Sequence, residues 1–388
     1  MTLLLQTEPP RPEGPALKLS NMKRRPLGHT GLHVSELCLG TMSFGWRTRH
    51  STALTLLDEF VEAGGTFLEA AQICPDVLTP PDWAGLPESS IGDWLRSRQH
   101  PRESLILATR LVWNPDRHLP SDSLANCCEA SLRRLKTDYL DLLVCDWTPT
   151  TPQLEDMLHG LTRLVEQGKV RHLAVSSFGA WQTGENLRQN SLRQLAGIGT
   201  IQADYSLLDR QSEPQLLGPN AGRLGFIARS PLAGGFLALP NHACQSLQDP
   251  RRRRNLHLRY GHSTGQAVCS AVESVAKDLG ATMAQVSYSW VLSNPAVSAL
   301  LIAPLSVNQL HDAIEATDLS LSWPQLRRLD LVSSTYLSPE DIAPALPEPS
   351  DRGQVLPWRG NGSDQTDDDT KSGGERVITL DFVEPPVR

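Results

Sequence analysis

Two side chains that can do chemistry, Glu69 and Cys74, lie five residues apart in the stretch Gly-Gly-Thr-Phe-Leu-Glu-Ala-Ala-Gln-Ile-Cys, residues 64–74. The Gly-Gly pair and the apolar run after it predict a turn followed by a short buried strand, Thr66–Leu68. We expect a loop to begin at Glu69 and to carry both side chains. A carboxylate can serve as a general base, and a thiol becomes a nucleophile where its surroundings lower its pKa.

The rest of the chain alternates between short apolar runs and helical patterns, which indicates an α/β fold with a parallel sheet. About eight such units predict closure into a (β/α)8 TIM barrel, in which the loops after the strands form the active site. The alternative, a doubly wound sheet, is disfavoured because no strand leads at once into a GxGxxG turn and a helix. Predicted strands are Leu37–Leu39, Thr66–Leu68, Leu105–Thr109, Tyr139–Cys145, His172–Val175, Ile198–Ala203, Gly225–Arg229 and Val297–Ile302. Predicted helices are Ala53–Ala63, Ile91–Arg98, Ser121–Leu135, Leu154–Glu166, Trp181–Gln189, Gly265–Leu279 and Val307–Ala316.

The composition divides the chain into three parts. Residues 1–21 are rich in proline and lack a sustained period, so we expect a flexible arm. Residues 22–336 form the barrel domain, with a hairpin turning at Gly28–Gly31 that can plug the barrel floor, and with a long loop, Leu237–His262, over the mouth. Residues 337–388 form a tail rich in Pro, Asp and Gly that ends in the β-prone run Arg376–Val383. This run is expected to lie on the chain's own surface, to be disordered, or to add to a partner's sheet edge.

The charge and the cysteines limit the classes of function. A net charge of −7 argues against a nucleic-acid or membrane surface, and we expect the basic run Arg251–Arg254 to be a solvated loop. Seven cysteines without a CxxC pair, and no recognisable signal segment, predict a reduced, cytoplasmic environment. No residues show a dedicated metal-ligand spacing, so no metal site is predicted.

Several motifs in order along residues 22–334 resemble the aldo-keto reductase superfamily, whose members are NADPH-dependent (β/α)8 barrels. They include Leu39-Gly40-Thr41-Met42, Ala130-Ser131-Leu132-Arg133-Arg134-Leu135, Thr137-Asp138-Tyr139-Leu140-Asp141-Leu142, Gly168-Lys169-Val170-Arg171 and Ser230-Pro231-Leu232-Ala233-Gly234-Gly235. The resemblance implies a catalytic tetrad of Asp, Tyr, Lys and His. At the matching positions this chain has Glu69, Cys74, Arg110 and Asp146, so all four residues differ from the pattern.

The cofactor positions implied by the resemblance are also changed. The resemblance implies NADP(H) contacts at Gly40, Thr41, Ser176, Gln202, Ser230, Ser306 and Gln309. The Ser-Asn pair that holds the nicotinamide carboxamide reads Ser176-Ser177, and the aromatic that stacks on the ring is replaced by Arg229. Positions that approach the adenosine 2′-phosphate carry Ala303 and Leu305 instead of a glycine and a basic residue. We therefore expect NADP(H) to be a possible but poorly supported ligand.

These substitutions leave three functions open. Glu69 and Arg110 keep both signs of charge, so an ion pair between them is expected, but a thiol cannot occupy the position of a phenol. Asp146 is expected to repel a developing oxyanion, or else to cap a helix near Thr150. The first interpretation is a binding or regulatory protein that has lost carbonyl reduction, with a small molecule in the mouth or a protein partner on the tail. The second is a non-redox enzyme that uses Cys74, Asp146 and Arg110, and the third is a divergent NADP-dependent oxidoreductase.

Overall fold

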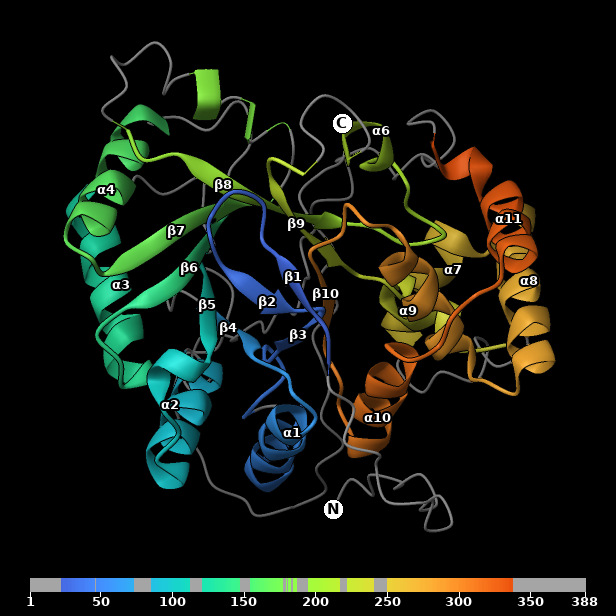
Figure 1. The fold of residues 1–388 in the computed structure, drawn as a ribbon, viewed down its shortest axis with the longest axis horizontal. Helices are drawn as coiled ribbons and strands as arrows, with labels where there is room; N and C mark the ends of the chain where they lie inside the picture. The colour runs from blue at the N-terminus through green and yellow to red at the C-terminus, as the bar shows by residue number, and fades with distance from the viewer. Residues whose placement is uncertain are drawn as a thin grey trace, which may run out of the picture.

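A computed structural model of the chain describes residues 22–337, apart from 46, 73–84, 112–120, 147–153, 177–178, 180, 183, 187–194, 217–221 and 241–249. Eight parallel strands close into a barrel in the order β10-β3-β4-β5-β6-β7-β8-β9, and helices surround it (Figure 1). The expected (β/α)8 barrel is therefore confirmed. The barrel strands are β3 (Leu37–Gly40), β4 (Phe67–Gln72), β5 (Ile106–Leu111), β6 (Leu140–Cys145), β7 (Val170–Val175), β8 (Ile198–Asp204), β9 (Gly225–Arg229) and β10 (Ala299–Ile302).

The outer layer consists of helices that pack on the strands and on one another. They are α1 (His50–Glu62), α2 (Leu86–Arg98), α3 (Ser121–Leu135), α4 (Leu154–Glu166), α6 (Glu213–Leu216), α7 (Pro250–Tyr260), α8 (Ser263–Leu279), α9 (Met283–Ser293), α10 (Val307–Ala316) and α11 (Trp323–Val332), with short 3-10 turns η3 (Ala233–Ala238) and η5 (Ser334–Leu337). The sequence did not predict α9, because nearly all of its side chains are buried and no polar face marks a helical period. A capping box fixes its start, where the Thr282 hydroxyl and the Gln285 side chain each accept the other residue's backbone N–H.

The loop expected at Leu237–His262 is wrong in part, because the segment contains the helix α7. The run Arg251–Arg254 is helical instead of forming a loop, and Arg253 and Arg254 are exposed. Leu256 and Tyr260 are buried one turn apart, so α7 is held on one side. The helix expected at Trp181–Gln189 lies partly outside the described residues.

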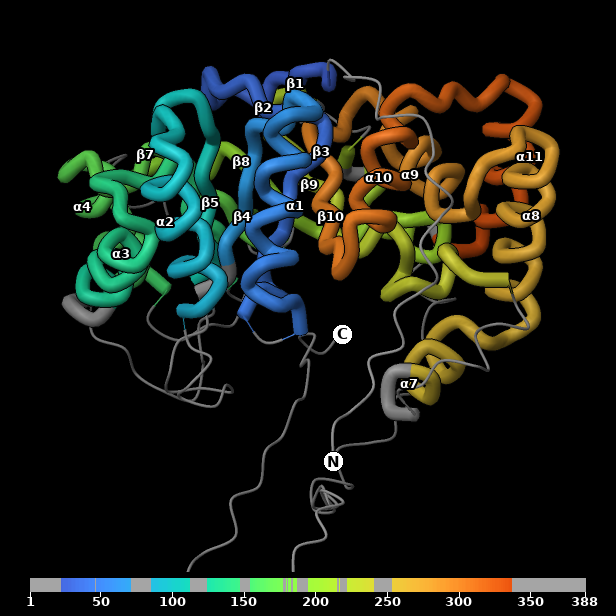
Figure 2. Tube along the Cα trace, turned by 90° about the horizontal axis from the view of Figure 1, so that it is seen from below, coloured from blue at the N-terminus to red at the C-terminus, as the bar shows by residue number. Residues whose placement is uncertain are grey.

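The predicted hairpin plugs the barrel floor. β1 (Arg24–Pro26) pairs antiparallel with β2 (His33–Ser35), and Figure 2 shows the pair across one end of the barrel. Leu27 and Val34 are fully buried in a cluster with Phe67 and other side chains that line the barrel interior. Gly28 has a φ of +55°, and a Cβ there would meet the backbone nitrogen of Gly225 at 2.2 Å. The close approach of the hairpin to β9 therefore requires a glycine.

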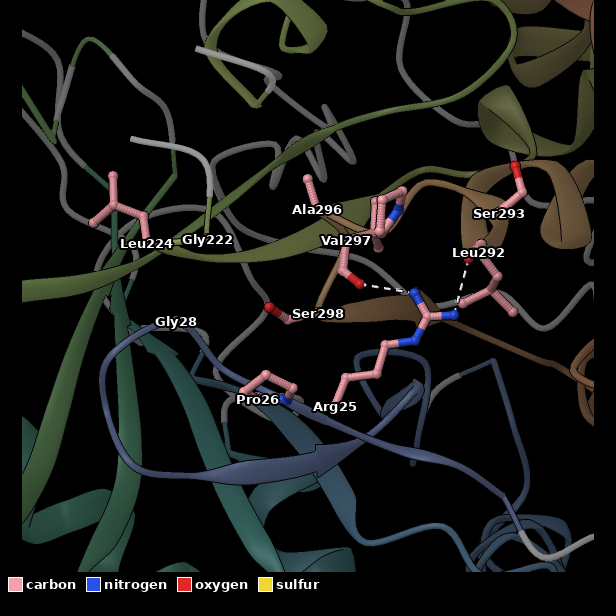
Figure 3. A pocket seen from close by; sticks show the side chains of 11 residues that line it. Arg25, Pro26, Gly28, Gly222, Leu224, Leu292, Ser293, Ala296, Val297 and Ser298 are labelled. Atoms are coloured by element: carbon pink, nitrogen blue, oxygen red, sulfur yellow. Dashed lines mark hydrogen bonds between the residues drawn. The ribbon is translucent and has the colours of Figure 1, made fainter. Parts of the chain in front are cut away.

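Arg25 fastens this hairpin to the loop before β10. Its guanidinium donates to the carbonyl oxygens of Val297 at 3.0 Å and Leu292 at 2.9 Å (Figure 3). It also donates to the Glu36 carboxylate at 3.2 Å. A cleft of about 360 Å³ lies beside these contacts. It is on the floor, at the amino ends of the strands, and therefore far from the side chains at the opposite end.

Candidate active site at the barrel mouth

Glu69 lies inside β4 and not in a loop, which corrects the sequence prediction. β4 pairs with β5 residue by residue from Phe67 to Gln72, so the strand continues past Leu68. Glu69 is 6% exposed, and it shares its face of the strand with Phe67, which lines the barrel interior. The carboxylate is therefore held below the mouth.

Arg110 and Asp146 form a two-pronged ion pair at the mouth. The Arg110 Nε lies 2.9 Å from one Asp146 carboxylate oxygen, and its Nη2 lies 2.8 Å from the other. Arg110 precedes the last residue of β5, and Asp146 follows the last residue of the neighbouring β6. This parallel fork is the strongest geometry for a guanidinium and a carboxylate. The Asp146 carboxylate is therefore held by Arg110, and the region near Thr150 that it was expected to cap lies outside the described residues.

Gln202 separates Arg110 from Glu69, so the ion pair expected between those two residues is wrong. The Gln202 Oε1 accepts from Arg110 Nη1 at 2.5 Å, and its Nε2 donates to the Glu69 carboxylate. Gln202 is fully buried on β8. The result is a chain of contacts across the barrel: Asp146, Arg110, Gln202, Glu69.

A second ion pair borders this chain and was missed by the sequence prediction. Arg229 Nε donates to the Asp204 carboxylate at 2.7 Å, between residues that are in register on β8 and β9. Asp204 lies two residues after Gln202 and thus on the same face of its strand. That period of two is the signal in the sequence that could have placed Asp204 at the mouth.

Burial governs the acidity of the inner groups. Removal from water raises the pKa of the Glu69 carboxyl, while Arg110, the Gln202 hydrogen bond and Arg229 oppose the shift. Burial, and then the nearby Glu69 charge, raise the pKa of the Cys38 thiol well above its ordinary value. Cys38 is therefore an inert neutral group inside the barrel.

Glu69→Gln is expected to remove a pH dependence of stability. A carboxyl whose pKa is higher in the folded than in the unfolded protein binds more protons when folded. The free energy of unfolding therefore falls as pH rises from the ordinary glutamate pKa through the raised one. Glutamine does not titrate, so the variant lacks this fall. Its side-chain oxygen can still accept the Gln202 hydrogen bond. Urea unfolding of both proteins between about pH 4 and 8 measures the difference; parallel pH profiles would contradict the assignment.

The other predicted residues lie at the same end of the barrel but make local contacts. The Thr41 hydroxyl, which is buried, donates to the Glu69 carbonyl at 3.1 Å. Ser176 is half-buried in the bend after β7. Ser230 has a φ of +53°, and its backbone carbonyl accepts the Ala233 N–H at 2.8 Å. Gly40 ends β3 against Ile302 and Leu301. Cys74 lies outside the described residues.

The start of α10 satisfies its own backbone donors. The Ser306 hydroxyl accepts the Gln309 N–H at 3.4 Å, and the Gln309 side chain accepts the Leu305 N–H at 2.9 Å. Both bonds use N–H groups that an anion at this helix terminus would contact.

These contacts do not fit NADP(H) in the manner that the resemblance implies. Both ends of the Gln202 amide are engaged by charged neighbours, so it is not set to hold a carboxamide. Arg229, at the position of the stacking aromatic, is directed to Asp204. Ala303 and Leu305 offer no cation for a phosphate, and the N–H groups nearby are capped. At these described positions no cation is directed to a dinucleotide phosphate, which is held best by charge-assisted hydrogen bonds.

The described part of the chain offers neither a metal cluster nor a membrane-spanning helix. Its His, Cys, Asp and Glu side chains form no group of three or more that suits a metal ion. No helix among the described residues is both long and apolar enough to cross a bilayer.

Comparison with known proteins identifies the family. The family model described as "Aldo/keto reductase family" matches residues 36–333. An uncharacterized oxidoreductase of Bacillus subtilis, YrpG, is 34% identical over 318 residues, which cover 78% of this chain and 94% of the relative. Protein tas of Escherichia coli is 30% identical over 349 residues, covering 82% and 99%. A probable voltage-gated potassium channel subunit beta of Oryza sativa is 26% identical over 309 residues, covering 76% and 92%.

The match extends from β3 to the end of α11 and so includes the whole barrel. Members of this family generally use NADP(H). The barrel, its order of strands and the sequence match agree, and the chain belongs to the aldo/keto reductase family.

Proposed function

We propose that this member of the family is a binding or regulatory protein that does not reduce carbonyl groups by the family's standard route. One observation carries the proposal: the Arg110 cation is engaged by the Asp146 carboxylate through two hydrogen bonds. In the standard route a lysine at this position lowers the pKa of a tyrosine that donates the proton. A cation neutralised by an adjacent carboxylate has little effect on the pKa of a third group.

The proton donor itself supports the same conclusion. The position that corresponds to the tyrosine is Cys74, whose thiol is shorter than a phenol by a ring. Loss of a positioned general acid lowers a rate by about 10²–10⁴. Asp146 then places a carboxylate, which has no hydrogen to donate, where the standard route has a neutral donor, so the carbonyl oxygen loses that hydrogen bond.

The mouth offers a place for a small molecule. Arg110, Asp146, Asp204 and Arg229 are all partly exposed and form two ion pairs at one end of the barrel. Such a rim favours a polar ligand with donors and acceptors over an aldehyde that carries a single carbonyl. The relative named as a probable channel subunit supports a role within an assembly for a protein of this fold.

The names of other relatives favour a second candidate, a divergent NADP-dependent oxidoreductase. YrpG and YqkF of Bacillus subtilis are both named as oxidoreductases. Such a protein needs to hold NADPH by contacts other than those of the standard family site.

Titration with NADPH separates the two candidates. The fluorescence of NADPH is followed as protein is added, at cofactor concentrations up to about 1 mM, the upper end of ordinary Michaelis constants. The proposed function predicts no saturable change. Saturable binding with a micromolar dissociation constant would support the oxidoreductase and count against the donor-set argument. Addition of unlabelled NADP⁺ as a competitor distinguishes site binding from nonspecific quenching.

A further inference from the structure

Helix α11 exposes an unusual amount of apolar surface. Trp323 is 72% exposed and Leu331 is 62% exposed, and of the ten residues in this helix only Leu329 is buried. The other large apolar side chains that are exposed in the described part of the chain are Met42 and Leu258. Half of this exposed set thus lies on one short helix at the outer edge of the helical layer, beside α8 (Figure 1). An exposed apolar patch of this kind marks a contact surface.

The patch is shallow, and Arg327 lies within it between Trp323 and Leu331; this surface is called the α11 groove below. Its lining residues are Trp323, Pro324, Arg327, Arg328, Leu331 and Val332. Trp323, Arg327 and Leu331 are spaced four residues apart and therefore follow one face of the helix. The Arg327 guanidinium lies 5.8 Å from the Trp323 ring centre. Eight residues of helix span about 12 Å, which sets the length of the groove.

The end of the same chain has the complementary pattern. In Arg376–Val383 the side chains of Ile378, Leu380 and Phe382 alternate with others and share one face of an extended segment. Four residues of strand span about 14 Å, close to the length of the groove. Glu375, Asp381 and Glu384 accompany this run, and residues 338–388 contain eleven acidic and five basic side chains. The segment thus matches the groove in length, apolarity and charge.

We propose that residues 376–383 bind the α11 groove of their own chain. The described chain ends at η5, directly after α11, and residues 338–375 connect it to the segment. A linker of that length spans about 35 Å on average, more than the groove requires. Tethering gives an effective concentration of about a millimolar, so a contact with a dissociation constant of about 0.1 mM is closed about ten times more often than open.

A second copy of the chain is a poorer occupant. Stable interfaces use about 20–30 residues on each side. The groove has six lining residues. A tethered segment does not bear the full cost of bimolecular association, and so a small groove is sufficient for it.

Hydrogen exchange of the full-length protein, read by mass spectrometry, tests this contact. The amides of residues 376–383 are expected to exchange about tenfold more slowly than those of a free peptide of the same sequence. Trp323→Ala should return them to the peptide rate. This variant is expected to fold normally, because the side chain is mostly exposed, and an unchanged melting temperature verifies it. Leu258→Ala, at the other strongly exposed leucine, is the matched control and should leave the slow exchange unchanged.

Three outcomes overturn the proposal. Exchange at the peptide rate in the unaltered protein shows that the segment is unbound. Slow exchange that survives Trp323→Ala shows that it binds elsewhere. Slow exchange that appears only as protein concentration rises, together with a dimer mass, shows that a second copy occupies the groove.

Discussion

Replacing Arg110 by methionine is expected to lower the free energy of unfolding by about 3 kcal/mol, through loss of a partly buried ion pair and a hydrogen bond. The side chain is 14% exposed and donates to both Asp146 carboxylate oxygens and to Gln202. Methionine fills much of the space, so the effect reports the lost polar contacts more than a cavity. Asp146 is 26% exposed and regains some water, which places the expected loss at the lower end of the range for fully buried pairs.

Arg98→Met is a matched control for this experiment. Arg98 also holds a carboxylate with two bonds, from Nε at 3.0 Å and Nη2 at 2.6 Å to Asp58, but on the outside of the barrel. Because exposed pairs contribute little, this variant should stay close to the unaltered protein. Urea unfolding monitored by circular dichroism gives both values. Equal losses of unfolding free energy in the two variants would show that the Arg110 network stabilises the protein no more than an exposed surface pair does.

Arg110→Lys separates charge from geometry. Lysine keeps the positive charge but has one nitrogen, so it cannot reach both Asp146 oxygens and Gln202 at once. We expect a stability between those of the methionine variant and the unaltered protein. A lysine variant as stable as the original would mean that charge alone holds the mouth together.

The strands of the barrel were predictable from the sequence because each is a short apolar run between turn signals. Glu69 was misplaced since a charged residue usually marks the end of a buried strand, whereas here Gln202 satisfies the carboxylate inside the barrel. Helix α9 lacked a polar face, and α7 was hidden by its proline and its run of arginines. Local patterns therefore predicted the elements but not every boundary.

The pairing of Arg110 with Asp146 needed the structure. Each residue could be placed at the end of its strand, yet 36 positions separate them along the chain. Their contact depends on the register of β5 against β6, in which Arg110 is opposite Val144. Barrel register is a property of the whole closed sheet and cannot be deduced from either strand alone. The charged residues at the mouth were evident from the sequence, but the expected partner of Arg110, Glu69, was wrong.

The unaltered protein is expected to reduce a simple aldehyde with NADPH at least about 10⁴-fold less efficiently than ordinary enzymes. This figure combines the loss of a general acid, about 10²–10⁴, with the loss of one hydrogen-bond donor to the carbonyl oxygen, about 10²–10³. Ordinary enzymes have kcat/KM values of about 10⁴–10⁸ M⁻¹s⁻¹. Measured against the least efficient of these enzymes, the expected value here is therefore about 1 M⁻¹s⁻¹ or below.

Two variants make this assay interpretable. The Arg110→Met variant, purified in the same way, lacks the mouth network. Any activity of this preparation therefore measures contaminating reductase. The fourfold variant Glu69→Asp, Cys74→Tyr, Arg110→Lys, Asp146→His restores the residue types of the standard route. Activity in the fourfold variant would show that the remaining mouth still accommodates the cofactor, and inactivity would agree with the donor-set argument at Gln202 and Arg229.

The decisive measurement is the rate at which the unaltered protein oxidises NADPH with benzaldehyde as substrate, followed by loss of NADPH absorbance. An Arg110 cation neutralised by Asp146, with a thiol in place of the phenol, predicts a rate no higher than that of the Arg110→Met preparation. Turnover well above that background, with kcat/KM in the range of ordinary enzymes, would contradict the account.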